Sequence, residues 1–361
     1  MKARVFATFA VVTAATPGFG QDRLNIYNWS DYIAEDTIEK FEAETGIDVT
    51  YDVYDSNEVL EAKLLAGSSG YDLVVPTSDF LRRQVQGGIY LPLDRSKIPN
   101  WDNLDPAMME AAATYDEGNE HAVIYMWGTT GVGYNVDMVR ERLGDDAPTD
   151  SFDLILNPEY AEKLADCGIA ILDSQAEVIE PVLNYLGHDP HTQDPDLLEE
   201  AAAALETILP YVRYFHSSQY ITDLANGEIC AAMGWSGDVF IAADRAAEAD
   251  NGVEIAYTIP KEGTVQWFDM MAIPADAPNP DAAHAFINFV LQPEIIADIT
   301  NYVYYPNAVP ASKEFIEAEI VDDPSIYPPQ EVLDNLFPSG FLEPRTERIL
   351  TRLWTRVRTG Q

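Results

Sequence analysis

Three short segments of the sequence place aromatic rings and a carboxylate within five residues of one another. They are residues 28–32 (Asn-Trp-Ser-Asp-Tyr), 235–238 (Trp-Ser-Gly-Asp) and 267–269 (Trp-Phe-Asp). The faces of Trp and Tyr rings attract a cation, and a carboxylate neutralises its charge. These residue types together suit an organic ammonium ion. Each segment alone has an ordinary alternative, in which the ring packs in the core and the carboxylate caps a helix.

Most of the candidate residues follow the end of a predicted strand, and loops at the carboxyl ends of strands are where α/β proteins bind ligands. The strands are predicted at residues 24–27, 71–75, 169–172 and 229–233, and the residues that follow them are Trp29, Ser30, Asp31, Tyr32, Thr77, Asp79, Glu177, Trp235 and Asp238. Trp267 and Asp269 begin a further strand, and Tyr305 follows a late helix. This common position favours one shared site over separate capping roles.

A cleft built from these residues fits a dication with an aliphatic spacer. Each ammonium group needs carboxylate partners, because a buried unpaired charge is very costly. The methylene groups need flat apolar walls, which Trp and Tyr supply while adding about 0.5–2 kcal/mol per cation–π contact. Ser and Thr hydroxyls accept the remaining N–H bonds.

The elements that must position these residues alternate between strands and helices, which is the mark of an α/β fold. Further strands are predicted at 49–53, 212–215, 254–259 and 267–273, and helices at 36–44, 57–66, 195–209, 220–227, 280–291 and 343–357. Two extended segments, 124–127 and 131–135, flank Gly128-Thr129-Thr130 and are interpreted as a first crossing between two lobes. Residues 263–265 are interpreted as the return crossing.

The chain has 361 residues, 47% of them hydrophobic, which is enough for two lobes with a core each. Residues 1–20 are predicted to be a secretory signal peptide, with Lys2 and Arg4 before an apolar run and a small-x-small pattern at residues 18–20. That run is shorter than the roughly 20 residues needed to span a bilayer. We therefore expect an exported, soluble protein without a membrane anchor.

The two cysteines, Cys167 and Cys230, fit an oxidising compartment. We predict a disulfide between them, and closing a loop of about 60 residues would stabilise the fold by about 4 kcal/mol in the chain-entropy model. The alternative is two buried free thiols.

The formal net charge is −40, from 61 acidic and 21 basic side chains. Without a basic surface to meet phosphates, the chain is not expected to bind nucleic acid. The charge attracts cationic solutes over a range limited by salt screening. An acidic surface that serves solubility in a salty medium is the alternative explanation for most of it.

Enzyme signatures are missing from the sequence. The five histidines are scattered, and no nucleophile elbow, phosphate-binding loop or Cys/His metal spacing is present. We therefore expect no catalytic residues, no cofactor and no metal site.

Five stretches resemble periplasmic polyamine-binding proteins of ABC transporters, with the putrescine-binding members most similar: residues 28–32, 55–61, 71–76, 215–220 and 234–239. The likeness covers essentially the whole mature chain. It implies an α/β fold of the two-lobe periplasmic binding type (type II), with a mixed sheet flanked by helices in each lobe and two crossovers between lobes. The expected N-terminal lobe comprises residues 21–129 and 264–307, and the C-terminal lobe comprises residues 130–263 and 308–361.

The resemblance also implies a role for each site residue. Trp29 and Tyr32 would wall the cleft, Ser30 and Ser217 would add polar contacts, and Asp31 would bind one ammonium. Glu177, Asp238 and Asp269 would hold the other end of the ligand, and Trp235, Trp267 and Tyr305 would pack the methylene chain. The implied partners are putrescine and a membrane permease, and a monomer is expected.

Four positions bear on the length of the ligand. Thr77 stands where a serine is usual, and Asp79 adds a carboxylate near the site. Trp267 matches the spermidine-type members, whereas Ser174 lacks the acid that those members share. A spermidine-preferring protein of the same fold is therefore the nearest alternative, and a sensor input module is another. An enzyme acting on amines is disfavoured, because neither a cofactor motif nor a nucleophile–base pair is visible.

Overall fold

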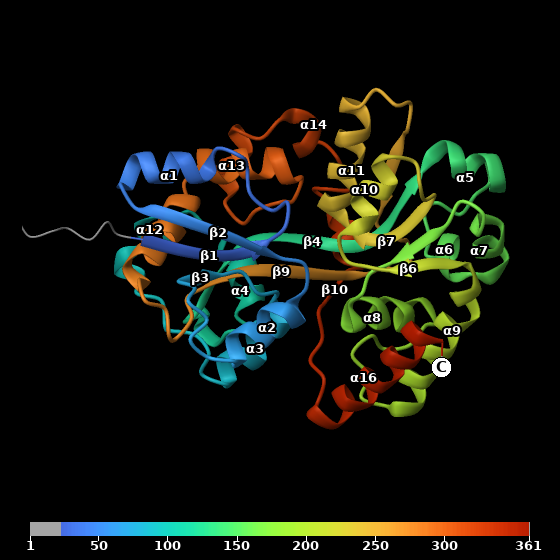
Figure 1. Ribbon diagram of the computed structural model, residues 1–361, viewed down its shortest axis with the longest axis horizontal. Helices are drawn as coiled ribbons and strands as arrows, with labels where there is room; N and C mark the ends of the chain where they lie inside the picture. The colour runs from blue at the N-terminus through green and yellow to red at the C-terminus, as the bar shows by residue number, and fades with distance from the viewer. Residues whose placement is uncertain (1–22, 361) are drawn as a thin grey trace, which may run out of the picture.

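The computed structural model describes residues 23–360, so the predicted signal peptide lies outside the described residues. Strands in this part of the chain form a sheet in the order β2-β1-β3-β9-β4-β7-β5-β6, with β10 beside β9 and β8 beside β4 (Figure 1). The strands are β1 (Arg23–Trp29), β2 (Asp48–Tyr54), β3 (Leu73–Val74), β4 (Ala122–Asn135), β5 (Ile169–Ile171), β6 (Val212–Phe215), β7 (Ala231–Trp235), β8 (Ile255–Thr258), β9 (Val265–Ala272) and β10 (Phe337–Pro338).

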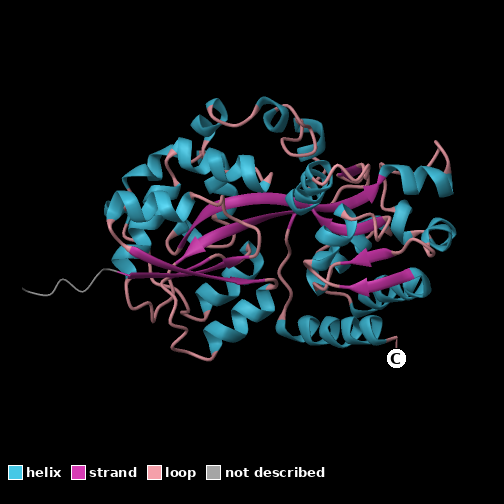
Figure 2. Ribbon diagram, turned by 45° about the horizontal axis from the view of Figure 1, so that its top comes forward, coloured by secondary structure: helices cyan, strands magenta, loops and turns pink. Residues whose placement is uncertain are grey.

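Helices flank the strands in both halves of the molecule (Figure 2). They are α1 (Thr37–Thr45), α2 (Asn57–Leu65), α3 (Ser78–Gln86), α4 (Pro106–Ala112), α5 (Val136–Leu143), α6 (Asp153–Leu156), α7 (Pro158–Leu164), α8 (Gln175–Tyr185), α9 (Pro195–Ile208), α10 (Gln219–Ala225), α11 (Ser236–Glu248), α12 (Pro280–Val290), α13 (Pro293–Val303), α14 (Ala318–Val321), α15 (Gln330–Leu333) and α16 (Pro344–Thr359). Within residues 23–360, none of these helices combines the length and the apolar character needed to cross a bilayer.

Two hydrophobic cores divide the described chain. The first gathers buried side chains from β1, β3, β9 and the first half of β4, such as Leu24, Ile124 and Met270. The second gathers buried side chains from the end of β4, from β5 and β7, and from α16, such as Val132 and Leu353. We call the parts built around these cores the N-terminal lobe and the C-terminal lobe.

Strand β4 connects the two lobes as one uninterrupted element. It pairs antiparallel with β9 from Ala122 to Thr129, and with β7 from Thr130 to Tyr134. The sequence predicted two extended segments around residues 128–130, whereas the structure has a single strand. The glycines in this run are explained by close packing, since a Cβ on Gly128 would lie 2.7 Å from the Trp267 ring and a Cβ on Gly131 would lie 2.4 Å from the Thr258 carbonyl oxygen.

The chain passes between the lobes again through β9 and once more near its C-terminal end. Strand β10 pairs with the start of β9, and the segment after it leads to α16. Helix α16 packs beside α8 and α9 in the C-terminal lobe (Figure 1), where Arg356 pairs with Glu206 over 2.6 Å. Strands β4 and β9 and the segment between β10 and α16 connect the two lobes, which face each other across a crevice.

Local sequence rules account for many element boundaries. Gly46 ends α1 in the left-handed conformation with φ 73°. Ser56 caps α2 by accepting a hydrogen bond from the Val59 amide, and Asp194 caps α9, whose first residue is Pro195. These three residues account for the end of α1 and the starts of α2 and α9.

The predicted disulfide is confirmed. Cys167 and Cys230 are bonded, and both side chains are buried in the C-terminal lobe. Cys167 precedes β5 and Cys230 precedes β7, which are neighbouring parallel strands. The bond therefore joins the entrances of two adjacent strands, away from their carboxyl ends.

Candidate functional site

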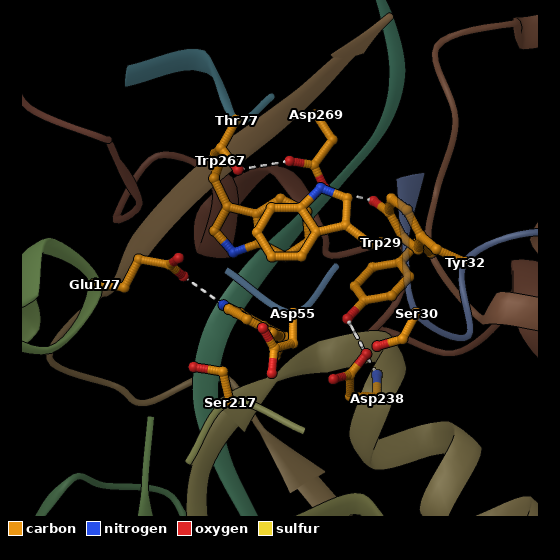
Figure 3. A pocket seen from close by; sticks show the side chains of 12 residues that line it. Trp29, Ser30, Tyr32, Asp55, Thr77, Glu177, Ser217, Asp238, Trp267 and Asp269 are labelled. Carbon is orange, nitrogen blue, oxygen red and sulfur yellow. Dashed lines mark hydrogen bonds between the residues drawn. The ribbon is translucent and has the colours of Figure 1, made fainter. Parts of the chain in front are cut away.

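A pocket lies in the crevice, where side chains of both lobes face each other (Figure 3). It contains about 420 Å³ of space free of protein atoms, part of it continuous with solvent. Its lining residues are Trp29, Ser30, Tyr32, Asp55, Thr77, Glu177, Ser217, Trp235, Asp238, Trp267, Asp269 and Tyr305.

The strand-to-helix transitions place the polar side chains. Thr77 precedes α3, while Glu177 and Asp238 lie in the first turns of α8 and α11. A carboxylate in the first turn interacts favourably with the positive end of the helix dipole. Asp269 instead lies on β9 and forms an isolated bridge with Thr77, which brings it to the same edge.

Asp269 is buried in the N-terminal lobe and held by two hydroxyl donors. The Thr77 hydroxyl donates to Oδ1 over 2.7 Å, and the Tyr32 hydroxyl donates to Oδ2 over 2.8 Å. Asn57 holds Thr77 in turn, by donating to its hydroxyl over 2.9 Å. Burial raises the pKa of Asp269 to about 7, and the two donors oppose this shift.

Asp238 is held in the same way from both lobes. Tyr220 of the C-terminal lobe donates to Oδ2 and Tyr305, which packs in the N-terminal core, donates to Oδ1, each over 2.8 Å. Burial raises the pKa of Asp238 to about 7, and the two phenols again oppose the shift.

Glu177 is the third buried carboxylate of the pocket. It accepts a hydrogen bond from the Trp235 indole N–H and another from the Thr130 hydroxyl over 3.0 Å. Burial raises the pKa of Glu177 to about 8, the highest of the three. In Figure 3 Glu177 and Asp238 lie on opposite sides of the aromatic rings.

Aromatic rings from both lobes fill the space between these carboxylates. The rings of Trp29 and Trp235 meet across the crevice at 5.6 Å between centroids, with planes at 75°. Trp267 and Tyr305 lie 5.4 Å apart. The Trp29 indole N–H donates to the Val75 carbonyl over 2.9 Å, which fixes the orientation of that ring.

Among the described residues, the pocket is lined by acidic side chains without basic partners in the same lining. No Lys, Arg or His is among the lining residues within the described part of the chain. Three buried carboxylates therefore have only neutral donors, and their charged forms are destabilised until a cation enters. Aromatic walls and separated carboxylates can hold an organic dication by charge pairing and cation–π contact.

Comparison with known proteins gives the family. Residues 36–328 match the model of the bacterial extracellular solute-binding proteins. The chain belongs to this family. It is 51% identical over 358 residues to the putrescine-binding periplasmic protein PotF of Escherichia coli, covering 99% of this chain and 97% of that protein. It is 53% identical over 338 residues to the putrescine-binding periplasmic protein SpuD of Pseudomonas aeruginosa, covering 94% and 92%.

A solved structure shares the fold. The crystal structure of the spermidine/putrescine ABC transporter substrate-binding protein PotD from Streptococcus pneumoniae matches with a TM-score of 0.76 at 30% identity, covering 94% of this chain and 99% of that one. The predicted α/β fold of the periplasmic binding type is therefore confirmed, as is the resemblance from which it was inferred.

In this solute-binding protein, most of the residues expected at the site line one pocket. The structure brings together Trp29, Ser30, Tyr32, Thr77, Glu177, Ser217, Trp235, Asp238, Trp267, Asp269 and Tyr305. Asp31 and Asp79 do not line it.

The structure places Asp31 at the rim and not inside the pocket. It has φ 54°, in the turn that follows β1, and its carboxylate pairs with Arg245 of the C-terminal lobe over 2.7 Å. The Asp31 carboxylate therefore already has a basic partner, and the expectation that it binds an ammonium group stays a prediction.

Asp79 lines a neighbouring cavity between α3, α8 and the segment before α16. It lies in the first turn of α3, and Arg83 lies one turn later on the same helix. Burial raises the pKa of Asp79 to about 6, and Arg83 lowers it. Its carboxylate still acts electrostatically on Glu177 and Asp269, which is consistent with a position close to the pocket.

Asp55 lines the pocket but was not predicted from the sequence. It follows β2 directly, and its side chain is exposed at the rim. The rule that singled out the other residues, a polar side chain at a strand end, applies to Asp55 as well. Within residues 23–360, no cluster of three or more His, Cys, Asp or Glu side chains is suited to a metal ion.

Proposed function

We propose that this solute-binding protein captures putrescine between its two lobes and delivers it to the permease of an ABC transporter. The observation that carries this proposal is a pocket with three buried carboxylates, aromatic walls and no basic side chain among its described lining residues. A diamine supplies the missing positive charges at both ends and an apolar spacer between them.

The relatives support the same function. PotF and SpuD are described as putrescine-binding periplasmic proteins, and two relatives from Pseudomonas aeruginosa, 42% and 32% identical, are described as putrescine/agmatine-binding and putrescine/cadaverine-binding proteins. This likeness supports a periplasmic location and a role in binding rather than in catalysis. The predicted signal peptide would supply the export step.

Each part of the pocket has a proposed task. Asp269, in the N-terminal lobe, would bind one end of the ligand together with Thr77, whereas Asp238 and Glu177 would meet it from the C-terminal lobe. Trp29, Trp235 and Trp267 would cover the methylene chain. We propose the expected lobe boundaries at residues 129/130 and 263/264, and closure about them would bury the ligand. The third expected boundary, 307/308, precedes β10, which still pairs with β9 beside the N-terminal core.

Spermidine is the second candidate, and a specific cavity favours it. The cavity beside the pocket is lined by the carboxylates of Glu58, Asp79 and Glu180. Arg83 is a basic residue in the same lining. Glu180 is only 6% exposed, and its carboxylate accepts one hydrogen bond, from the Gly340 amide over 3.0 Å. A third ammonium group that left the pocket on this side would meet an acidic surface.

Calorimetric titration tests the function. The mature protein is titrated with putrescine, spermidine, cadaverine and agmatine under identical conditions. Putrescine is expected to bind with micromolar affinity or better, which corresponds to about 8 kcal/mol or more. Absence of heat and of any thermal shift with all four amines would reject the proposal, and a clear preference for spermidine would select the second candidate.

A further inference from the structure

We propose that Tyr220, which does not line the pocket, is a positioning residue that sets both the carboxylate and the aromatic wall of the C-terminal half-site. This inference rests on the proposed function and extends it to a side chain in the layer beneath the pocket. Tyr220 lies on α10, is 0% exposed, and packs in the core of the C-terminal lobe.

One phenol oxygen serves two neighbouring parts of the site. The Tyr220 hydroxyl donates to Asp238 Oδ2 over 2.8 Å and accepts a hydrogen bond from the Trp235 amide over 3.1 Å. Trp235 is the last residue of β7, and Asp238 lies in the first turn of α11. Tyr220 therefore fixes the geometry of the turn that presents both the indole and the carboxylate to the ligand.

The ring of Tyr220 occupies space that is free because residue 234 is a glycine. A Cβ built on Gly234 would lie 2.6 Å from Tyr220 Cε2, 3.0 Å from Cζ and 3.2 Å from the hydroxyl oxygen. Contacts under 3.0 Å force a shift, so any other residue at position 234 would push the phenol away from Asp238. The glycine allows the ring to pass directly beneath β7.

A second phenol completes the arrangement from the other lobe. Tyr305 donates to Asp238 Oδ1 over 2.8 Å and accepts from the Asp238 amide over 3.1 Å. Since Tyr305 belongs to the N-terminal core, its contact with Asp238 depends on how the lobes are arranged. The contact of Tyr220 lies within one lobe, so it holds Asp238 whether or not the lobes are closed.

Burial is the largest influence on the ionisation of Asp238 and opposes it, and the groups that face the carboxylate modify this effect. Tyr220 and Tyr305 favour the carboxylate by hydrogen bonding, and Arg245, on the same helix, favours it by charge. Asp31 and Asp269 oppose it from the N-terminal lobe. Removal of the Tyr220 hydroxyl takes away one favourable contribution, so the proton is held more tightly and competes better with an ammonium group.

The test is putrescine titration of Tyr220→Phe between pH 6 and pH 8.5. At pH 7 we expect a roughly tenfold loss of affinity, in line with the loss of one hydrogen bond to a charged group. The loss should be larger at pH 6 and smaller at pH 8.5, because the pH at which affinity reaches half its maximum moves upward. Gly234→Ala retains the phenol but displaces it, and should shift the pH profile in the same direction.

Tyr214→Phe is the matched control. Tyr214 also lies in the C-terminal lobe and donates to a carboxylate, Asp223 Oδ2, over 2.6 Å, but neither residue lines the pocket. Its removal should leave the affinity and the pH profile unchanged. Thermal unfolding of each variant confirms that the protein is folded before titration.

A double-variant comparison separates positioning from general support of the fold. In an Asp238→Asn background, Tyr220→Phe should cost much less than in the wild type, because its effect passes through the carboxylate. Equal losses in both backgrounds, or a Tyr220→Phe protein with the affinity and pH profile of the wild type, would overturn the inference. A wild-type protein that binds none of the four amines would overturn the proposed function itself, a result that is readily distinguished from the other two.

Discussion

The Asp31 carboxylate and the Arg245 guanidinium form an ion pair between the lobes, with 2.7 Å between Oδ1 and Nη2. Both side chains are 38% exposed, so the pair lies at the rim of the crevice and is screened by solvent. It connects the turn after β1 to α11, the helix that also carries Asp238. The pair therefore contributes to how the lobes meet.

Asp31→Asn should lower putrescine affinity less than roughly fivefold, because exposed ion pairs contribute about 0.2–1 kcal/mol. The small loss should decrease further in high salt. Calorimetric titration at two ionic strengths measures both effects. Asp166→Asn is the control, because its pair with Arg142 lies within the C-terminal lobe. A loss of tenfold or more would indicate that Asp31 contacts the ligand directly.

Putrescine affinity should rise with pH between pH 6 and pH 8.5. In the ligand-free protein, burial raises the pKa of Asp238 and Asp269 to about 7 and that of Glu177 to about 8, so these groups are partly protonated at neutral pH. A bound diamine favours the charged forms and displaces the protons. We expect roughly a tenfold or greater gain in affinity over this range, since one pKa unit corresponds to about 1.4 kcal/mol.

Proton release gives an independent measure of the same coupling. Titrations at pH 7 in buffers of different ionisation enthalpy should show that binding releases protons. The Asp238→Asn/Asp269→Asn protein should release fewer. Affinity that is constant from pH 6 to pH 8.5, with no proton release, would mean that the buried carboxyls are already ionised in the ligand-free protein.

The sequence alone predicts much of the fold because its signals are local. The strand at residues 212–215 has the predicted bounds. Strand β1 begins one residue before and ends two residues after the predicted range, and α9 ends one residue early. The rule that ligands bind at strand ends also needs only local sequence, and it located the segments around Trp29 and Trp235 that meet in the pocket.

The remaining features depend on contacts between distant residues. Asp31 pairs with Arg245 at the rim, and Arg245 lies 214 positions away in the sequence. Asp79 faces a separate cavity because of the direction in which α3 leaves Thr77. The run at residues 128–130 is continuous strand because Gly128 and Thr129 pair with β9 and Thr130 pairs with β7. The periodic pattern of apolar and polar residues does not show which distant residues come into contact.

The ligand-free protein should become less stable as pH rises from about 4 to about 8. The pKa values of Glu177, Asp238 and Asp269 are raised in the folded state, so that state binds more protons than the unfolded chain over this range. The stabilisation is present below the ordinary carboxyl pKa and is lost as pH passes the folded values. Calorimetric unfolding should therefore show a lower Tm at pH 8.5 than at pH 5.

The triple variant Glu177→Gln/Asp238→Asn/Asp269→Asn is the control for this pH effect. It should show a smaller decline of Tm between pH 5 and pH 8.5, since the three buried carboxyl groups with raised pKa values are gone. Saturating putrescine should raise the Tm of the wild type more at pH 8.5 than at pH 5. A wild-type Tm that increases across this range would contradict the assignment.

Asp269→Asn should weaken putrescine binding at least tenfold, because it removes a buried charge that we propose pairs with one ammonium group. Asp72→Asn is the matched control. Asp72 is 0% exposed and accepts a hydrogen bond from the Asn25 amide over 2.8 Å, but it does not line the pocket. That substitution should lower Tm without changing affinity. Wild-type affinity in the Asp269→Asn protein would exclude Asp269 from the ligand site.

Removal of the Cys167–Cys230 disulfide should destabilise the protein without abolishing binding. The bond spans 63 positions, and a closed loop of this length restricts the unfolded chain by about 4 kcal/mol in the chain-entropy model. Urea unfolding of the Cys167→Ala/Cys230→Ala variant measures the loss, with the wild type in a reducing agent as the comparison. Neither cysteine lines the pocket, so putrescine affinity at 25 °C should change less than roughly threefold. A much larger loss of affinity at a temperature where the variant is folded would show that the bond also sets the geometry of β7 and therefore of Trp235 and Asp238.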